Sequence, residues 1–451
     1  MPRPADTIAA LATPAGTSAL ALIRISGSNT EAALGGLAGG LPPVRRARHA
    51  EYRGTDGVLI DDVVCVRYAG PGSYTGEDAA ELSCHGNPLI AQKIVEDLFR
   101  RGCRPAEPGE FTLRAFLNGR MDLSQAEAVM EVIHARSDRA LAAAHRQLRG
   151  ALGRRMQTLV DELLHTLAQI EAQIDFPEED LPPEDRNDIR RSVSHIQLMT
   201  NSLLANSHYS QLLRDGVRVV ILGAPNAGKS SLLNRLVGRD RALVSPEPGT
   251  TRDFIEERVL FGPHCFRLID TAGFNPTPGS IEAQGIAKTV ECALEADILL
   301  VVVDATHPTL PCFPAELIAR LGVTPTLVVI NKSDLSPAVA VSVGFPTPPP
   351  LRVSALTGEG VEALRAGLVA LVDQSSVDVE NVVTINARHA NALTEAHTCL
   401  TSSLQKLESG EPLELVASDL RGVMAAFGEI TGRIDNERML DQLFRSFCIG
   451  K

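Results

Sequence analysis

The sequence predicts a multidomain chain: an α+β domain comes first, and an α/β domain of doubly wound type is inserted into an all-α helical domain. The chain has 451 residues, too many for one hydrophobic core, so about three domains are expected. Residues 217–373 alternate short apolar strands with helices, as a doubly wound parallel sheet requires. Helical periodicity fills the segments on either side of them.

Composition places the chain among globular proteins. It is 44% hydrophobic and 22% charged. No segment approaches the roughly 18 consecutive apolar residues of a membrane span, and no secretion signal is recognisable, so we expect a cytoplasmic protein. The eight cysteines are scattered without a Cys-x-x-Cys pair. We therefore expect most of them to be small buried residues rather than disulfide partners or zinc ligands.

The formal net charge of -12 argues against a broad phosphate-binding surface. If the substrate is a nucleic acid, a basic partner protein is expected to hold most of it. The local basic runs at 44–48 and 100–104 are interpreted as solvated faces.

Residues 1–120 form the predicted first domain. Apolar runs at 7–12, 19–25, 58–66 and 80–84 indicate strands, and apolar spacing predicts a helix over 88–101.

Residues 121–215 and 377–451 form the two parts of the predicted helical domain. Long helices are expected over 124–175 and 185–215, and Ser124 followed by Glu127 suggests a capping box at the first helix start. The α/β domain, 216–376, lies between the two parts, with a proline-rich surface loop at 344–350.

A phosphate-binding loop is the strongest local motif. Residues 223–230 read Gly-Ala-Pro-Asn-Ala-Gly-Lys-Ser, after the apolar run 217–222 and before a helical run from Ser231. Glycines let backbone N–H groups approach phosphate oxygens, Lys229 reaches the outer phosphates, and Ser230 offers a hydroxyl to Mg²⁺. The candidate nucleotide contacts here are Asn226, Ala227, Gly228, Lys229, Ser230 and Ser231.

Four further stretches follow in the order of a Ras-like guanine-nucleotide switch. They are Gly-Thr-Thr-Arg-Asp at 249–253, Asp-Thr-Ala-Gly at 270–273, Asn-Lys-Ser-Asp at 331–334 and Ser-Ala-Leu at 354–356. Asp334 can accept two protons from guanine in an arrangement that adenine does not offer, so the set predicts GTP as the nucleotide. The candidate GTP contacts in these stretches are Thr250, Thr251, Asp270, Thr271, Ala272, Gly273, Asn331, Lys332, Asp334, Ser354 and Ala355.

The group that orients the attacking water is unusual. Ras-type proteins place a glutamine after the switch-II glycine, and an arginine finger neutralises developing charge. Here that position is Phe274, and the nearest downstream acid is Glu282. Glu282 is interpreted either as the water-orienting group or as a solvated acid in the first turn of a helix. A monovalent cation held partly by Asn226 is a plausible replacement for the finger.

These residues together resemble the MnmE (TrmE) family of tRNA-modifying GTPases over essentially the whole chain. Besides the phosphate loop, the motifs that carry the resemblance are Asp-Thr-Ile at 6–8, Arg-Ile-Ser-Gly at 24–27, Tyr-Thr-Gly-Glu-Asp at 74–78, Cys-His-Gly at 84–86, the run 108–120, Ile-Asp-Phe-Pro-Glu-Glu at 174–179, Gly-Glu-Ile-Thr-Gly at 428–432 and the terminal Phe-Cys-Ile-Gly-Lys at 447–451.

The resemblance implies a potassium-activated GTPase that forms a homodimer through an N-terminal domain binding tetrahydrofolate. Such a protein works with the FAD-dependent partner MnmG (GidA), which uses NADH. Together they place an aminomethyl or carboxymethylaminomethyl group on C5 of the wobble uridine of tRNA. The implied one-carbon donor is a methylene- or formyl-tetrahydrofolate.

The resemblance also assigns roles to particular residues. Ser230 and Thr251 would ligate Mg²⁺, and K⁺ would be held by Asn226, Ser245, Glu247 and Thr250. The resemblance also makes Ser245 a candidate GTP contact. Glu282 has the family's spacing from a Gly-Ile pair at 285–286, which favours the water-orienting role. The implied folate residues are Arg24, Glu81, Arg120 and Lys451. Cys448 is interpreted either as a chemical group or as a small residue that packs the tail.

Two departures from the family pattern are the prolines within 274–280 and Pro248 in the switch-I loop. Two alternative functions are a GTP-controlled assembly factor, related through the nucleotide domain alone, and a free-standing one-carbon transferase with a regulatory GTPase. The first predicts an RNA-binding module after the switch domain, whereas residues 377–451 are helical and not markedly basic.

Overall fold

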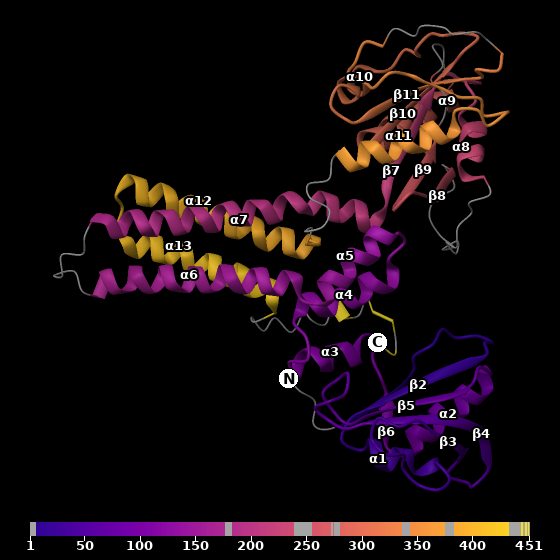
Figure 1. The fold of residues 1–451 in the computed structure, drawn as a ribbon, viewed down its shortest axis with the longest axis vertical. Helices are drawn as coiled ribbons and strands as arrows, with labels where there is room; N and C mark the ends of the chain where they lie inside the picture. The colour runs from indigo at the N-terminus through magenta and orange to yellow at the C-terminus, as the bar shows by residue number, and fades with distance from the viewer. Residues whose placement is uncertain are drawn as a thin grey trace. The chain divides into compact units, whose positions relative to one another are not determined.

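The computed structural model divides into two compact units, which we describe separately (Figure 1). Unit 1 comprises Met1–Met130, Leu148–Val160 and Met424–Lys451, and unit 2 comprises Glu131–Gln147 and Asp161–Val423. The structure describes residues 6–175, 183–238, 255–271, 274, 280–335, 343–374, 383–432, 443–444, 447–448 and 450, with the backbone alone at 183–185, 255 and 280–284.

Unit 1 contains, within its described residues, a sheet in the order β3-β4-β5-β2-β1-β6. The strands are β1 (Thr7–Leu11), β2 (Leu20–Ser26), β3 (Arg48–Arg53), β4 (Leu59–Tyr68), β5 (Ala79–His85) and β6 (Cys103–Pro105). The pairs are antiparallel except β1 with β6. Helix α2 (Pro88–Arg100) covers one face, and the side chain of Asn87 caps it by accepting from Leu89 N. The α+β class predicted for this part is confirmed.

The core of this sheet follows from strand alternation. Ala21, Ile23 and Ile25 of β2 are buried, and they pack with Ile94 and Leu98 of α2. Helices α1 (Thr30–Ala33) and α3 (Glu110–Leu117) complete the part before residue 120, together with the short 3₁₀ helix η1 (Leu34–Gly36).

The helices before residue 175 differ from the prediction in their number and boundaries. The predicted helix over 124–175 is three helices: α4 (Leu123–His134), α5 (Asp138–Leu148) and α6 (Ala151–Asp175). The hydroxyl of Ser137 accepts from Ala140 N and starts α5, and Gly150, at φ +79°, separates α5 from α6.

The capping prediction was also wrong. Helix α4 begins at Leu123, so Ser124 already lies inside it. Asp122 supplies the cap instead: its carboxylate accepts from Gln125 N, and the Gln125 side chain accepts from Asp122 N.

The helices of unit 2 form a bundle from segments far apart in sequence (Figure 1). Helix α7 (Pro183–Asp215) confirms the predicted helix over 185–215, and it lies against α12 (Ala387–Ser409), where Gln197 donates to Thr401 at 2.9 Å. Helix α13 (Leu413–Thr431) is joined to α6 by an ion pair between Arg421 and Glu171.

Chain order places an α/β part between α7 and α12, as predicted. Its described strands form a sheet in the order β12-β11-β10-β7-β9-β8, parallel except for the β8–β9 pair. The strands are β7 (Val217–Gly223), β8 (Ile255–Phe261), β9 (His264–Asp270), β10 (Ile298–Asp304), β11 (Thr326–Asn331) and β12 (Leu351–Arg352). The proline-rich segment 344–350 precedes β12 without regular structure, as expected.

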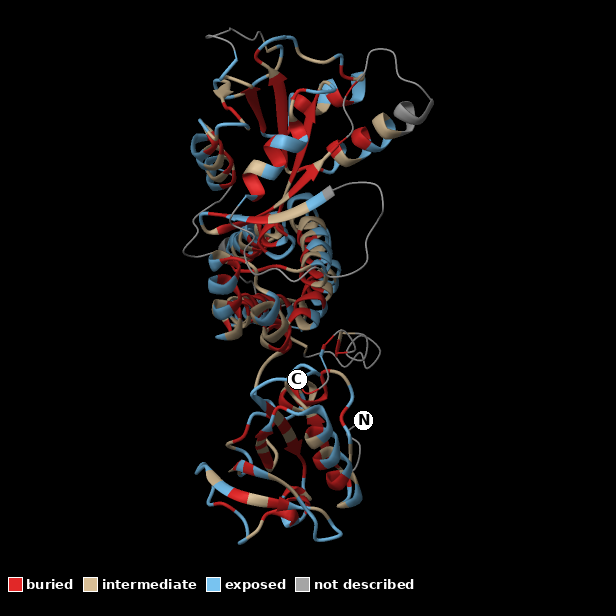
Figure 2. Cartoon of the chain, turned by 90° about the vertical axis from the view of Figure 1, so that its right-hand side faces the viewer, coloured by how far each residue is buried: buried red, intermediate tan, exposed pale blue. Residues whose placement is uncertain are grey.

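Helices cover both faces of this sheet, so its central strands are buried almost throughout (Figure 2). Helices α8 (Lys229–Val237) and α11 (Val361–Gln374) pack on one face, and α9 (Ser280–Leu294) and α10 (Ala315–Leu321) pack on the other. The doubly wound α/β class is confirmed.

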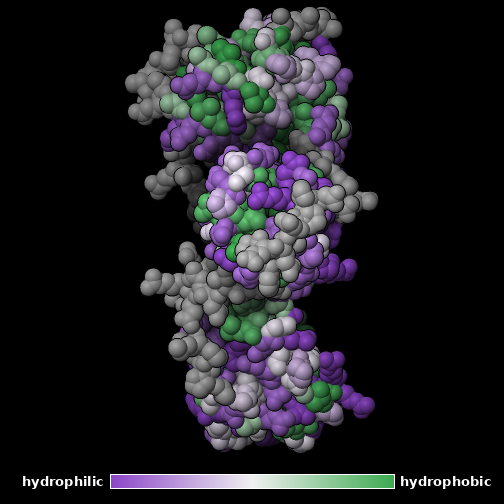
Figure 3. Space-filling view, turned by 90° about the vertical axis from the view of Figure 1, so that its left-hand side faces the viewer, coloured by the Kyte–Doolittle hydropathy of each residue, from purple (hydrophilic) through white to green (hydrophobic). Residues whose placement is uncertain are grey.

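The surface carries both kinds of side chain. On the face shown in Figure 3, hydrophilic side chains are prominent and smaller groups of apolar side chains are interspersed among them. Among the described residues, none of the helices combines the length and apolar character of a membrane span. The basic run at 44–48 is largely exposed, as predicted, whereas Arg101 and Arg104 in the second run form partly buried ion pairs. Four cysteines are buried, namely Cys65, Cys84, Cys103 and Cys265, and Cys312 and Cys448 are exposed.

Candidate functional site

The phosphate loop lies where β7 ends and α8 begins. Gly228 has φ +88°, and a Cβ there would lie 2.3 Å from Asn331 Nδ2. A Cβ on Gly223 would lie 2.5 Å from the carbonyl oxygen of Val302. Asn226 is exposed and has φ +61°. The glycines are therefore required by close approach of β10 and β11 as well as by the turn.

Lys229 is the buried cation of this loop. Its side chain is 7% exposed, and Nζ donates to the carbonyl oxygens of Gly223 at 3.3 Å and Ala224 at 3.0 Å. Burial lowers the pKa of the Lys229 ammonium, and the charge of Asp270 opposes that shift. The loop therefore holds a positive charge at the carboxyl end of β7.

Ser230 and Asp270 form the second part of the site. The exposed Ser230 donates from Oγ to Asp270 Oδ2 at 2.5 Å. The other carboxylate oxygen, Oδ1, is buried and has no hydrogen-bond partner among the described residues. A hydroxyl beside an unsatisfied carboxylate oxygen is a donor set that suits a hard cation such as Mg²⁺.

Phe274 lies in the hydrophobic core. Its N–H donates to Gly223 O at 3.1 Å, its side chain is 4% exposed, and its ring packs edge-on against Phe313 at 5.2 Å. The residue that occupies the glutamine position of Ras-type switches is therefore unable to orient water. The backbone of Glu282 lies in the first turn of α9, where both interpretations of this residue remain open because its side chain is outside the described residues.

Asn331 joins three loops at the same edge of the sheet. It is 1% exposed; its Nδ2 donates to Ala227 O at 2.9 Å, and its Oδ1 accepts from Ala355 N at 3.0 Å. One side chain thus connects the phosphate loop to the segment predicted to cover the base.

The remaining nucleotide candidates lie around it. Ser354 is buried and accepts from Thr357 N at its hydroxyl, Thr271 donates to Ile221 O, and Ser231 and Asp334 are exposed. The predicted residues Ser245, Glu247, Thr250, Thr251, Ala272, Gly273 and Lys451 lie outside the described residues.

A second candidate site lies in unit 1 around Arg24. Arg24 of β2 is the cross-strand neighbour of Glu81 on β5, and its guanidinium donates twice to Glu81 Oε1, at 3.0 and 3.2 Å. Nη1 donates to Gly450 O at 3.2 Å, and Cζ lies 5.6 Å from the ring centre of Tyr74. Phe111 lies on the same guanidinium at 5.8 Å.

The C-terminal tail reaches this site through close contacts. A Cβ on Gly450 would lie 2.7 Å from Leu11 O, and Gly109 N donates to Cys448 O at 3.4 Å. Cys448 itself is exposed. Arg120 is exposed, and its side-chain stem lies beside Gly76, where a Cβ would be 3.3 Å from Arg120 Cγ. Of the four predicted folate residues, Arg24 and Glu81 are thus the two that contact each other directly in the described structure.

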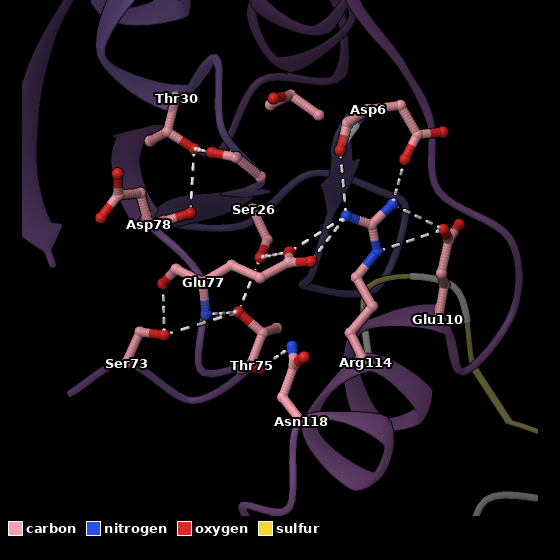
Figure 4. A network of polar contacts seen from close by, with 12 residues as sticks. Asp6, Ser26, Thr30, Ser73, Thr75, Glu77, Asp78, Glu110, Arg114 and Asn118 are labelled. Carbon is pink, nitrogen blue, oxygen red and sulfur yellow. Dashed lines mark hydrogen bonds and ion pairs between the residues drawn. The ribbon is translucent and has the colours of Figure 1, made fainter. Parts of the chain in front are cut away.

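Sequence reasoning missed the ion network that frames this site. Arg114 of α3 binds Asp6 at 2.7 Å, Glu77 at 3.0 Å and Glu110 at 3.0 Å (Figure 4). Ser26, at the end of β2, donates to Glu77 at 2.8 Å. Burial alone would lower the pKa of Arg114, but the carboxylates raise it overall. The motifs at 6–8, 24–27, 74–78 and 108–120 therefore meet in one charged cluster.

Comparison with known proteins agrees with the geometry. The family described as GTP-binding protein TrmE N-terminus matches residues 7–120, and the MnmE helical domain family matches residues 123–448. The chain is 52% identical over 458 residues to the tRNA modification GTPase MnmE of Opitutus terrae, with 100% of both chains covered. It is 42% identical over 458 residues to the protein of the same name from Akkermansia muciniphila, again with 100% coverage of both.

Among solved structures, the chain is similar to the G domain of the T. maritima FeoB iron transporter. The two share 25% sequence identity, the match covers 34% of this chain and 98% of that one, and the TM-score is 0.26.

Proposed function

Because this chain belongs to the MnmE family of tRNA modification GTPases, we propose that it is a potassium-dependent GTPase that modifies the wobble uridine of tRNA with a flavoprotein partner. The product is an aminomethyl or carboxymethylaminomethyl group on C5 of that uridine. The observation that carries the proposal is the convergence of Lys229, Ser230, Asp270 and Asn331 at one edge of the second sheet.

In the proposed nucleotide site, the phosphate loop binds the GTP phosphates and Asp334 selects guanine. Ser230 would hold Mg²⁺ with Thr251, beside the unsatisfied oxygen of Asp270. Asn226, exposed in the loop, would hold K⁺ with Ser245, Glu247 and Thr250. Both cations would supply positive charge where negative charge develops during phosphoryl transfer.

Glu282 is the proposed water-orienting residue, because Phe274 is fixed in the core by its ring contact and its backbone bond. Its position in the first turn of α9 places it close along the chain to the Asp-Thr-Ala-Gly motif. Loss of such a group slows the chemical step without removing the residues that bind nucleotide.

The test is GTP hydrolysis by the full chain in matched K⁺ and Na⁺ buffers, with Glu282→Ala and the control Glu291→Ala on the exposed side of the same helix. We expect stimulation by K⁺, and a loss of about 10²- to 10⁴-fold in kcat for Glu282→Ala with GTP affinity retained. Glu291→Ala should hydrolyse GTP like the unaltered chain. Equal rates in the two salts would refute potassium dependence, and an active Glu282→Ala would refute its role.

The proposed folate site is the cluster around Arg24 and Glu81, with Arg120 and Lys451 contributing. A bound tetrahydrofolate would supply the one-carbon unit. Guanidinium and ammonium groups suit the carboxylates of a folate tail, a carboxylate suits the donor edge of its pterin ring, and Tyr74 and Phe111 present aromatic rings beside Arg24. Cys448 is exposed beside the tail contact with Gly109, where it either packs the tail or takes part in chemistry.

The proposed assembly is a homodimer through the N-terminal domain, joined by an MnmG-type protein that carries FAD and uses NADH. The net charge of -12 favours a partner that holds most of the tRNA. We assign the domains as 1–120 for folate and dimerisation, 121–215 and 377–451 for the helical domain, and 216–376 for the G domain, and we place the reaction in the cytoplasm. GTP hydrolysis would move the G domains and so assemble the modification site.

A further inference from the structure

Asp304 is a partly buried carboxylate that has no role in the nucleotide site proposed above. It ends β10, and its side chain is 16% exposed. Oδ1 accepts from Thr306 N at 2.8 Å and from Thr306 Oγ1 at 2.7 Å. Oδ2 accepts from the ammonium of Lys332 at 2.6 Å. One oxygen therefore holds the local turn, and the other holds a side chain of the next strand's loop.

The position of Lys332 connects this ion pair to the nucleotide site. Lys332 follows Asn331, whose side chain binds Ala227 O in the phosphate loop, and it precedes Asp334 by two residues. Lys332 has φ +61°, a left-handed conformation that a residue with a side chain rarely adopts. The backbones of the two segments are also hydrogen-bonded, because Ala305 N donates to Asn331 O at 2.9 Å.

We propose that Asp304 is a positioning residue for guanine-nucleotide binding: it fixes the side chain of Lys332 and thereby the loop that carries Asp334. The proposal rests on the assignment of Asp334 to guanine made above. A free lysine side chain has many rotamers, and ordering it during binding would weaken affinity. An ion pair formed before the nucleotide arrives removes that entropic cost, so Asp304 should affect nucleotide affinity rather than the chemical step.

A purely structural role in the 304–307 turn is distinguishable by choice of variant. Asp304→Asn keeps an oxygen for Thr306 but removes the charge that holds Lys332. Thr306→Val removes the hydroxyl bond of the turn and leaves the ion pair intact. Glu316→Gln serves as the charge control, because it removes an exposed charge from α10, a helix that packs on the same sheet as β10.

The experiment is equilibrium fluorescence titration of the full chain with N-methylanthraniloyl-GDP, together with steady-state GTP hydrolysis. For Asp304→Asn we expect the Kd and KM to rise about tenfold while kcat stays within about twofold. Thr306→Val and Glu316→Gln should bind like the unaltered chain. Asp304→Glu, which keeps the charge, should recover most of the affinity and also provides a test if Asp304→Asn folds poorly.

A double-mutant cycle with Lys332→Met tests the pair directly. The double variant should bind no more weakly than Lys332→Met alone, because Asp304 acts through Lys332. Additive losses, or an Asp304→Asn Kd within about twofold of the unaltered chain, would overturn the proposal.

Asp334→Asn separates this proposal from the assignment on which it rests. An asparagine presents an N–H₂ donor that suits the second carbonyl of xanthine, so the variant should prefer xanthine to guanine nucleotide. If that switch occurs but Asp304→Asn binds GDP normally, only the role of Asp304 is overturned. If Asp334→Asn keeps the original preference for guanine, the base-site assignment fails, and the Asp304 proposal fails with it.

Discussion

Replacing Asn331 by alanine should weaken nucleotide binding, although the Asn331 side chain is buried beneath the phosphate loop and the 354–356 segment. Asn331 makes two well-formed bonds, to Ala227 O at 2.9 Å and from Ala355 N at 3.0 Å. Each partner left unsatisfied costs about 1–3 kcal/mol, so the two together should cost roughly 2–6 kcal/mol of free energy. If nucleotide binding must reorder both loops, this corresponds to an increase of about 30- to 20,000-fold in the Kd for GDP.

The assay is fluorescence titration with labelled GDP, accompanied by thermal unfolding of the nucleotide-free chain. Asn234→Ala is the matched control, because Asn234 is exposed on α8 of the same domain. Its Kd should stay within about twofold of the unaltered value. If Asn331→Ala were folded and bound GDP within about threefold of the unaltered chain, Asn331 would not organise the loops.

Two other predictions concern stability. Arg114→Met should destabilise the N-terminal sheet by about 2–4 kcal/mol, because it removes a positively charged partner from three partly buried carboxylates. The control is Arg53→Met, which removes an exposed ion pair and should cost at most about 1 kcal/mol. Hydrogen exchange in β1 and β2 measures the difference, and equal protection in the two variants would contradict it. Burial lowers the pKa of His264 below its ordinary 6.5, although Asp373 at 2.9 Å opposes the shift. The stability that His264 contributes is therefore present above pH 6.5 and is lost as the pH falls through the lower folded-state pKa. His264→Gln should flatten the dependence of the melting temperature on pH below pH 6.5, and an unchanged slope would refute this.

The parts of the fold that sequence predicted are those with local signals. The phosphate loop, the Asp-Thr-Ala-Gly motif and the base motif each follow a buried strand, and parallel strands bring their carboxyl ends to one edge. The strand β3 gave no such signal, because only Ala50 and Tyr52 of its six residues are buried. The break at 149–150 was missed because a single glycine is weak evidence against a long helical run.

Long-range partners explain most of what sequence missed in the sites. Arg114 and Asp6 are 108 residues apart, and Asp304 and Lys332 are 28 residues apart, so neither pair has a spacing that indicates contact. Phe274 shows the opposite case: its identity alone excluded a water-orienting role, and the core contact with Phe313 supplied the reason.

The central claim is tested most directly by mass spectrometry of the wobble uridine in tRNA. The reaction contains this chain, an active MnmG-type flavoprotein, NADH, GTP, K⁺ and methylene-tetrahydrofolate, with a suitable amine donor, and Glu282→Ala serves as the control. We expect an aminomethyl or carboxymethylaminomethyl group on C5 in the complete mixture and a strong decrease with Glu282→Ala. An unmodified uridine in the complete mixture, with the flavoprotein shown to be active, would contradict the proposed function.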